Sequence, residues 1–162
     1  MDEDRHAIRL DQFLAHPPAK VWRVLTEPDL LARWLMPTDF KPEVGHRFTF
    51  RTTPKPATGF RGVVYCEVLE LEPERLLKLS WSDGERADWT VTWRLRPEGR
   101  GTRLFFDHEG FDPDDAMQRM ARRIMGGGWR STHERTVPAL LDEMDEMDEM
   151  DELDELDERA VR

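Results

Sequence analysis

Two histidines, His108 and His133, are the side chains of this sequence best placed to do chemistry together. His108 shares a face with Leu104 and Phe106 on a segment that has the period of a β-strand. His133 lies four residues after Trp129, on one face of a predicted helix. Histidine titrates near neutral pH, so the pair could act as general acid and base from opposite walls of one cavity. The alternative, which the residues alone favour, is a structural role in which both histidines form hydrogen bonds within a partly buried network.

Large apolar side chains are predicted to face the same space between a sheet and its covering helices. Rings of this size bury about 150–250 Å² each and would stabilise any core. They could also line a ligand pocket of about 300–1,000 Å³. For a single ring the ordinary core is the simpler interpretation, because protein interiors are close-packed. The candidate ligand-binding residues are Trp34, Phe48, Phe50, Leu79, Trp81, Trp89, Trp93, Phe106, His108, Trp129 and His133.

Other chemistry has little support in the sequence. No spacing of His, Asp or Glu supplies the third and fourth ligands of a metal site, so neither a metal nor a cofactor is predicted. Cys66 is the only cysteine, and its apolar surroundings favour an inert buried thiol. Gly126-Gly127-Gly128 precedes a helical segment but lacks the lysine of a phosphate loop. No residue is assigned a catalytic role, and whether the chain is an enzyme stays open.

The formal charge of −10 in this 162-residue chain belongs to its tail. Residues 142–158 repeat Asp-Glu-Met and Asp-Glu-Leu, and they hold twelve acids, while residues 1–141 carry equal numbers of acidic and basic side chains. A neutral body with an acidic tail argues against nucleic acid as a partner, since that affinity rests on neutralising phosphates. We find no unbroken apolar run long enough to span a membrane, and the first five residues lack the regions of a signal peptide. A cytoplasmic protein is the simplest expectation.

The elements that must position these residues follow from the hydrophobic period. Residues 6–15 and five segments between residues 44 and 108 have the period of two that is typical of strands, and short turns connect the later ones. Two short helices are predicted after the first strand, and residues 112–141 are predicted to be helical. We expect Gly126-Gly127-Gly128 to break this last segment and Pro138 to kink it. A helix that faces a one-sided antiparallel sheet of about six strands is an α+β arrangement.

The tail is treated as a unit separate from the domain of residues 1–141. Its apolar residues, Met144, Met147, Met150, Leu153 and Leu156, recur every three positions. An α-helix has 3.6 residues per turn, so each step slips by about 60° and no single face can bury the whole stripe. Residues 142–162 are therefore predicted to form an extended solvated helix or to be disordered. An acidic arm for a basic protein partner is the less favoured alternative.

Several strings, in matching order over about residues 6–141, resemble the SRPBCC (START, birch-allergen-like) superfamily, in the branch named after the activator of the heat-shock chaperone ATPase. Each string is short, and their collinear order carries the resemblance. The strings are Pro18-Ala19-Lys20-Val21-Trp22, Leu31-Ala32-Arg33-Trp34, Val44-Gly45-His46-Arg47-Phe48, Leu69-Glu70-Leu71-Glu72-Pro73, Ser80-Trp81, Thr92-Trp93, Gly101-Thr102-Arg103-Leu104, His108-Glu109-Gly110-Phe111 and Gly128-Trp129.

The resemblance implies a helix-grip fold, in which a long C-terminal helix crosses a curved antiparallel sheet with an apolar cavity between them. The resemblance implies a sheet of seven strands, whereas the hydrophobic period of this sequence indicates six. The acidic repeat has no counterpart in the family pattern. Its members mostly bind small hydrophobic molecules, and only some branches catalyse a reaction. We therefore predict a protein that binds a small hydrophobic or aromatic ligand. A cyclase or hydrolase acting on a polyketide-like substrate and a chaperone-regulating interaction module are the alternatives, and a homodimer is left open.

Overall fold

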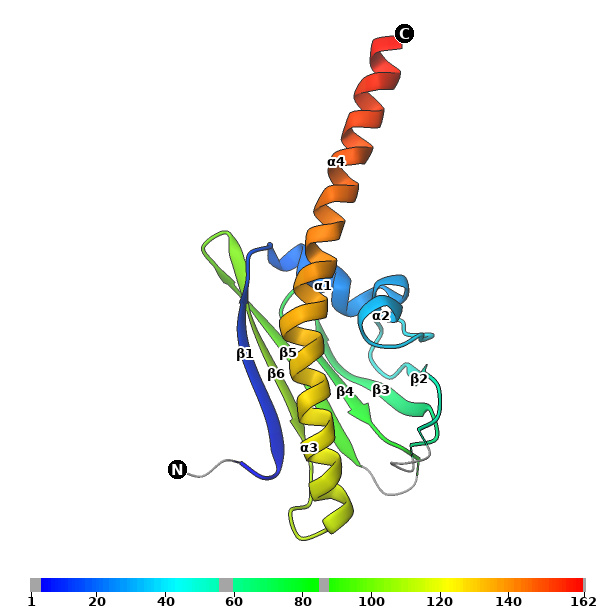
Figure 1. The fold of residues 1–162 in the computed structure, drawn as a ribbon, viewed down its shortest axis with the longest axis vertical. Coiled ribbons are helices and arrows are strands. Elements are labelled where there is room, and N and C mark those ends of the chain that lie inside the picture. The colour runs from blue at the N-terminus through cyan, green and yellow to red at the C-terminus, as the bar shows by residue number, and fades with distance from the viewer. Residues whose placement is uncertain (1–3, 56–59, 85–87, 162) are drawn as a thin grey trace.

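The computed structural model describes residues 4–55, 60–84 and 88–161, and its core is one curved antiparallel sheet (Figure 1). The strands are β1 (Ala7–Leu14), β2 (Arg47–Arg51), β3 (Val63–Glu72), β4 (Leu76–Trp81), β5 (Trp89–Glu98) and β6 (Gly101–Glu109). Their order across the sheet is β1-β6-β5-β4-β3-β2, and every neighbouring pair is antiparallel. Over the described residues, the predicted number of six strands is confirmed.

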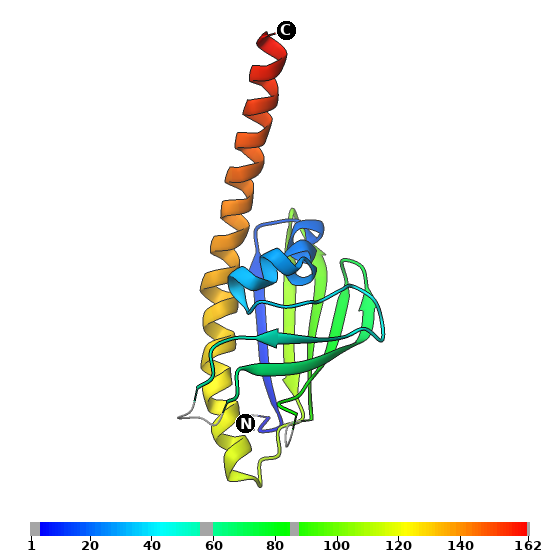
Figure 2. The ribbon, with the colours of Figure 1, turned by 90° about the vertical axis from the view of Figure 1, so that its right-hand side faces the viewer.

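One helical rod crosses the concave face of this sheet and extends beyond it (Figures 1 and 2). The rod consists of α3 (Ala116–Ser131), a π-helical turn η2 (Thr132–Thr136) and α4 (Val137–Val161), which follow one another directly. Two short helices, α1 (Pro18–Thr26) and α2 (Pro28–Trp34), follow β1 and pack beside the rod where it leaves the sheet. This is the α+β helix-grip arrangement that was predicted.

The period of two in the strands places one face of the sheet against the rod. In β4, Leu77, Leu79 and Trp81 are buried, and Lys78 and Ser80 between them are more exposed. The same alternation in β6 buries Leu104, Phe106 and His108. Because successive side chains of a strand point to opposite faces, one set of residues from each strand meets the helices.

The predicted helix break at Gly126-Gly127-Gly128 is wrong, since α3 continues through all three glycines to Ser131. Glycine lowers helix propensity by about 1 kcal/mol per residue, but it causes no steric block of the kind that proline does. Trp129 directly after the glycines is buried against the sheet. We infer that this tertiary contact outweighs the local preference.

Pro138 is accommodated by the π turn that precedes it. In η2 the Val137 N–H donates to the carbonyl of Thr132, five residues earlier. The next donor in that register would be residue 138, but proline has no N–H. The His133 carbonyl accepts instead from Gln12 Nε2 of β1, at 2.7 Å. Where a kink was predicted, the chain before Pro138 forms a π turn, and one side chain bonds this turn to the sheet.

The rod stays in contact with the body as far as Asp145. His16 lies 3.0 Å from the Asp142 carboxylate, Lys20 forms an ion pair with Asp145, and Met144 is only 4% exposed. From Met147 to Leu156 the apolar side chains of the tail are exposed. In the described part of the chain, no helix has both the length and the apolar character needed to cross a membrane.

Candidate functional site: an aromatic and histidine cluster

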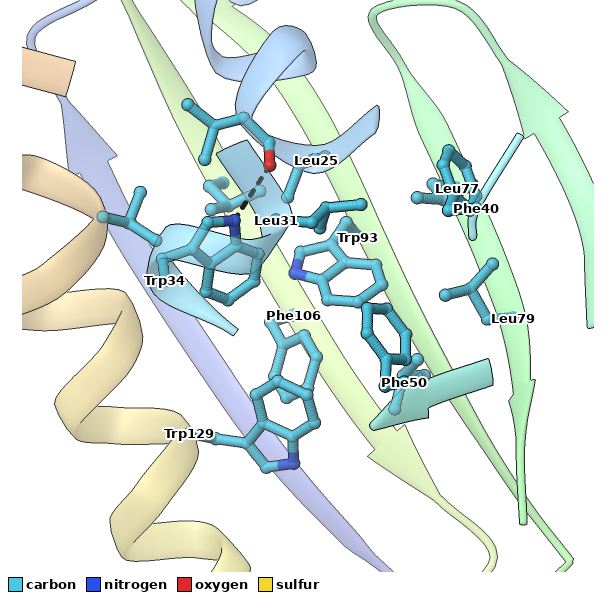
Figure 3. Packing of buried hydrophobic residues seen from close by; sticks show 14 of the residues in the cluster. Leu25, Leu31, Trp34, Phe40, Phe50, Leu77, Leu79, Trp93, Phe106 and Trp129 are labelled. Carbon is cyan, nitrogen blue, oxygen red and sulfur yellow. Dashed lines mark hydrogen bonds between the residues drawn. The ribbon is translucent and has the colours of Figure 1, made fainter. Parts of the chain in front are cut away.

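All eleven residues predicted to line a ligand site are buried, and those around the rod form one continuous cluster (Figure 3). Phe106 of β6 lies at its centre, with its ring centroid 4.6 Å from that of Trp129 and 4.6 Å from that of His133. Trp34 of α2 packs edge-on against His133 at 5.4 Å. The rod, the sheet and α2 therefore each contribute rings to the same space.

A second branch of rings leads from this centre toward β2. Trp81 lies 5.2 Å from Trp129 and 5.4 Å from Phe50. Phe50 in turn contacts Phe48 at 5.5 Å. The residues predicted from separate strands thus form a chain of contacts, although Phe48 itself lies at the end remote from the histidines.

Every polar atom of the His133 side chain has a partner. Trp93 Nε1 donates to His133 Nε2 at 3.0 Å, and His133 Nδ1 lies 2.8 Å from the carbonyl of Trp129. Because Nε2 accepts, Nδ1 carries the proton and donates to that carbonyl. With its own carbonyl held by Gln12, His133 is fixed from three sides.

His108 has one partner and one unpaired donor. Trp129 Nε1 donates to His108 Nδ1 at 2.9 Å, which places the ring proton on Nε2. Nε2 is buried and has no hydrogen-bond partner among the described residues. The imidazole is stacked on Phe111 at 4.6 Å and lies edge-on to Trp89 at 5.1 Å. A buried N–H without an acceptor costs about 1–3 kcal/mol, so this atom is the chemically exceptional point of the cluster.

Burial keeps both imidazoles neutral at physiological pH. It lowers the pKa of His108 to about 3 and that of His133 to about 4. The acceptor nitrogen of each ring already receives an indole N–H. Neither histidine therefore offers a free lone pair to take a proton, and the group that remains for a bound molecule is the Nε2–H donor of His108.

Three residues of this site, Phe111, Gly110 and Gln12, were not predicted as site residues. Phe111 stacks on His108, and Gly110 at φ 106° directs the chain back so that the backbone N–H groups of residues 110 and 111 reach the His6 carbonyl. Gln12 bonds the His133 backbone. The sequence did indicate that Gln12 faces inward, because it lies on the same side of the strand as Ile8 and Leu10. It did not indicate that Gln12 binds the His133 carbonyl.

Thiol and metal chemistry lie outside this site. Cys66 is buried on β3, and desolvation raises the pKa of its thiol. Within residues 4–55, 60–84 and 88–161, no group of three or more His, Cys, Asp and Glu side chains is arranged to hold a metal ion.

Two hollows lie on the surface, away from the cluster. One of about 780 Å³ lies between Pro17 and Pro18 and the turn that joins β3 to β4. The other, of about 570 Å³, lies along β1 and α3, beside Arg122, Arg123 and Arg130. None of the eleven predicted residues lines either hollow.

With this geometry in place, comparisons identify the family. The family described as "Activator of Hsp90 ATPase homolog 1-like protein" matches residues 15–141, and the chain belongs to it. The predicted resemblance is confirmed. No curated protein matches the chain.

One solved structure supports the same assignment, and two more distant ones share the fold. Protein MLL2253 from Mesorhizobium loti is 36% identical with a TM-score of 0.75, and the match covers 85% of this chain and 97% of that one. CalU16 from Micromonospora echinospora is 24% identical with a TM-score of 0.63, over 85% of this chain and 82% of that one. The Aha1 dimer from Colwellia psychrerythraea is 18% identical with a TM-score of 0.64, over 83% of this chain and 95% of that one.

Proposed function

We propose that this protein binds a small hydrophobic or aromatic molecule that carries one hydrogen-bond acceptor, between the sheet and α3. The observation that supports it best is the buried Nε2–H of His108, which has no partner among the described residues and is surrounded by aromatic rings. A ligand acceptor at this point would satisfy the donor, while its apolar part would contact Trp89, Trp81 and Phe111. Few well-placed polar groups within an apolar lining are typical of small-molecule sites.

The ligand would enter by displacing the first turns of α3. Trp129 is the only buried residue among the sixteen of this helix, whereas Ala121 and Met125 are partly buried against the core. A segment with so little buried apolar surface opens at low free-energy cost. Trp89 is the most exposed ring of the cluster, at 8%, and its Nε1 lies 3.4 Å from Gln118 Oε1 of α3. Separation of α3 from Trp89 would therefore open a path to His108.

The alternative of an acid–base enzyme receives less support from the same atoms. A general base needs a lone pair, and the acceptor nitrogens of His108 and His133 both receive an indole N–H. The low pKa values also leave too little of the protonated imidazolium at neutral pH for either histidine to act as a general acid. The alternative of a chaperone-regulating module rests on family membership alone, and no residue in the cluster favours it.

The proposal is tested with pairs of ligands that share one shape. An aromatic ketone and the hydrocarbon of the same skeleton would be titrated against the protein, with tryptophan fluorescence and thermal shift as readouts. We expect the ketone to bind about tenfold more tightly, because one hydrogen bond to a buried donor contributes about 1–1.5 kcal/mol. In His108→Leu/Trp129→Phe, which also removes the indole N–H that His108→Leu alone would leave unpaired, this difference between the two ligands should disappear.

The matched control is His46→Gln, which changes a histidine outside the cluster and should keep the preference for the ketone. Mass spectrometry of material that co-purifies with the protein would extend the panel of ligands. Equal binding of ketone and hydrocarbon to the unmodified chain would contradict the role of His108. If no lipid or aromatic compound binds and none co-purifies, the ligand-binding function itself is wrong.

A further inference from the structure

The hollow between β1 and α3, of about 570 Å³, is the most positively charged concavity of the described surface. The two elements that form it lie side by side (Figure 1). Its lining contains four arginines, Arg9, Arg122, Arg123 and Arg130, and one acidic residue, Asp4. None of the eleven residues of the aromatic cluster lines it, so what it binds is a question separate from the function proposed above.

Two of the four arginines already have partners within the protein. Arg9 forms ion pairs with Asp4 and Asp107. Arg122 donates to the backbone carbonyl of Ala7 at 2.9 Å and to that of Asp4 at 3.0 Å, which joins α3 to the start of β1. These two side chains therefore form the wall of the hollow, and we do not count them as ligands for an anion.

Arg123 and Arg130 are the two arginines left to bind an anion. Both are exposed, and neither has a hydrogen bond or an ion pair within the part of the chain that the structure describes. They are seven residues apart, nearly two helical turns, so they lie on one face of α3 about 10.5 Å apart along its axis. Gly126 and Gly127 lie between them and also line the hollow. The two long side chains can therefore converge over a stretch of helix that has no side chains of its own.

The charges nearby do not neutralise this pair. In the described chain Glu134, one turn after Arg130, forms no ion pair with it. The acidic repeat begins at Asp142, twelve residues and about 18 Å further along the rod. This distance is about two Debye lengths at physiological ionic strength, so the charge of the tail is largely screened there. An anion in the hollow would thus meet mainly positive charge.

We propose that this hollow binds the phosphate group of a phosphate monoester. Guanidinium groups present parallel N–H donors that match phosphate oxygens, and such charge-assisted bonds are roughly twice as strong as neutral ones. A phosphate monoester carries close to two negative charges near neutral pH, which Arg123 and Arg130 together balance. Ile8 also lines the hollow and offers an apolar contact for the organic part of the ester. The volume lies within the range of small-molecule sites.

Calorimetric titration of the full chain with phenyl phosphate tests the proposal. Benzenesulfonate has the same ring and a single charge, and it is the matched ligand. At low salt we expect phenyl phosphate to bind with a dissociation constant of about 1 mM or lower, and at least about tenfold more tightly than benzenesulfonate. Equal binding of the two ligands would contradict the preference for a phosphate monoester.

A second arm distinguishes a soluble ester from a lipid headgroup, since phosphatidic acid carries the same group. Vesicles of phosphatidylcholine with phosphatidic acid are compared with vesicles of phosphatidylcholine alone. Binding only to the vesicles with phosphatidic acid, without binding of phenyl phosphate, would support the site and identify a lipid as the source of the phosphate. If neither phenyl phosphate at about 10 mM nor these vesicles bind, the proposal is wrong.

Arginine variants locate the binding of whichever probe binds. Arg123→Gln and Arg130→Gln should each weaken it at least about tenfold. The matched control is Arg119→Gln, because Arg119 lies on the same helix outside the hollow and donates to the Pro113 carbonyl. It should change the dissociation constant by less than about threefold. Equal losses in all three variants would indicate general attraction to a basic helix and would overturn the site.

Two glycine variants separate the shape of the hollow from the stability of the helix. A Cβ at Gly127 or Gly128 would meet no atom within 4 Å, and leucine has a higher helix propensity than glycine. Gly127→Leu and Gly128→Leu should therefore both raise the Tm. Of the two, only Gly127 lines the hollow, so only Gly127→Leu should also weaken the binding of the probe, at least about tenfold. Undiminished binding in Gly127→Leu would show that the phosphate binds elsewhere.

Discussion

The two halves of the helical rod differ in what constrains their amino-acid sequence. From Trp129 to Asp145 the rod is in contact with the body, and Trp129, His133, Asp142 and Asp145 each bond to a side chain of another element. From Glu146 to Leu156 the residues follow a period of three that matches no helical face, and their apolar side chains are exposed. The packed half is thus specified by tertiary contacts, and the projecting half by the repeat alone. Substitutions in the two halves should therefore have different costs.

The largest effect is expected for His133→Leu in the packed half. This change leaves the buried Trp93 N–H without its acceptor, and it removes one of the donors to the Trp129 carbonyl, which keeps Thr132 as a partner. We expect unfolding by urea, followed by tryptophan fluorescence, to show a loss of about 4 kcal/mol. His133→Gln retains an acceptor for Trp93 and should cost less than half of this. Equal costs for Leu and Gln would show that packing, rather than hydrogen bonding, determines this position.

The pH dependence of stability should be nearly as large. Burial lowers the pKa of folded His133 to about 4, below the value of about 6.5 in an unfolded chain. Between these values the unfolded state binds more protons than the folded state. The contribution of His133 is therefore complete above pH ~6.5 and is lost as the pH falls toward about 4, by about 3 kcal/mol in total.

Comparison of variants separates the contribution of His133 to the pH dependence of stability from that of the carboxylates. The free energy of unfolding would be measured from pH 7.5 to 4.5 in the unmodified chain, His133→Gln and His46→Gln. The slope should be lower by about 1.4 kcal/mol per pH unit in His133→Gln below pH 6. A slope in His133→Gln equal to that of the unmodified chain would mean that this imidazole is not held neutral by burial.

Two methionines of the repeat compare the halves directly. Met144 is 4% exposed and Met147 is 58% exposed, although they are three residues apart in the same sequence pattern. Met144→Ala should cost about 2–3 kcal/mol, because it leaves a cavity in a packed contact. Met147→Ala should change the stability of the monomer by less than about 0.5 kcal/mol. Thermal unfolding in dilute solution measures both losses of stability. Equal losses would contradict a boundary between a packed and a projecting half that lies between Met144 and Met147.

The smallest effect concerns the bond between β1 and the π turn. Gln12→Leu leaves the His133 carbonyl without its donor and should cost about 1–2 kcal/mol in urea unfolding. Asp11→Leu on the opposite face of the strand is the control. In a Pro138→Ala background the residue 138 N–H can take over, so the cost of Gln12→Leu should fall below 0.5 kcal/mol, about the size of a surface change. If Gln12→Leu costs as much stability in the Pro138→Ala background as in the unmodified chain, Gln12 does not compensate for the N–H that Pro138 lacks.

The sequence indicated much of the site, because parity within strands and spacing within helices are local properties. They placed His108 beside Phe106 and His133 beside Trp129 in one buried space. They could not identify the indole donors, since Trp93 reaches His133 and Trp129 reaches His108 from other elements. The glycine run was interpreted wrongly for a related reason, because its low helix propensity is overcome by the burial of Trp129.

Periodicity, composition and collinear motifs by themselves determined the α+β helix-grip class and the family. These depend on which face of each element is apolar and on the order of the elements along the chain. Only the tertiary structure decided that His133 is fully bonded while His108 keeps one buried donor, and that a π turn accommodates Pro138. Those outcomes depend on distances of about 3 Å between residues up to 121 positions apart, which no local pattern encodes.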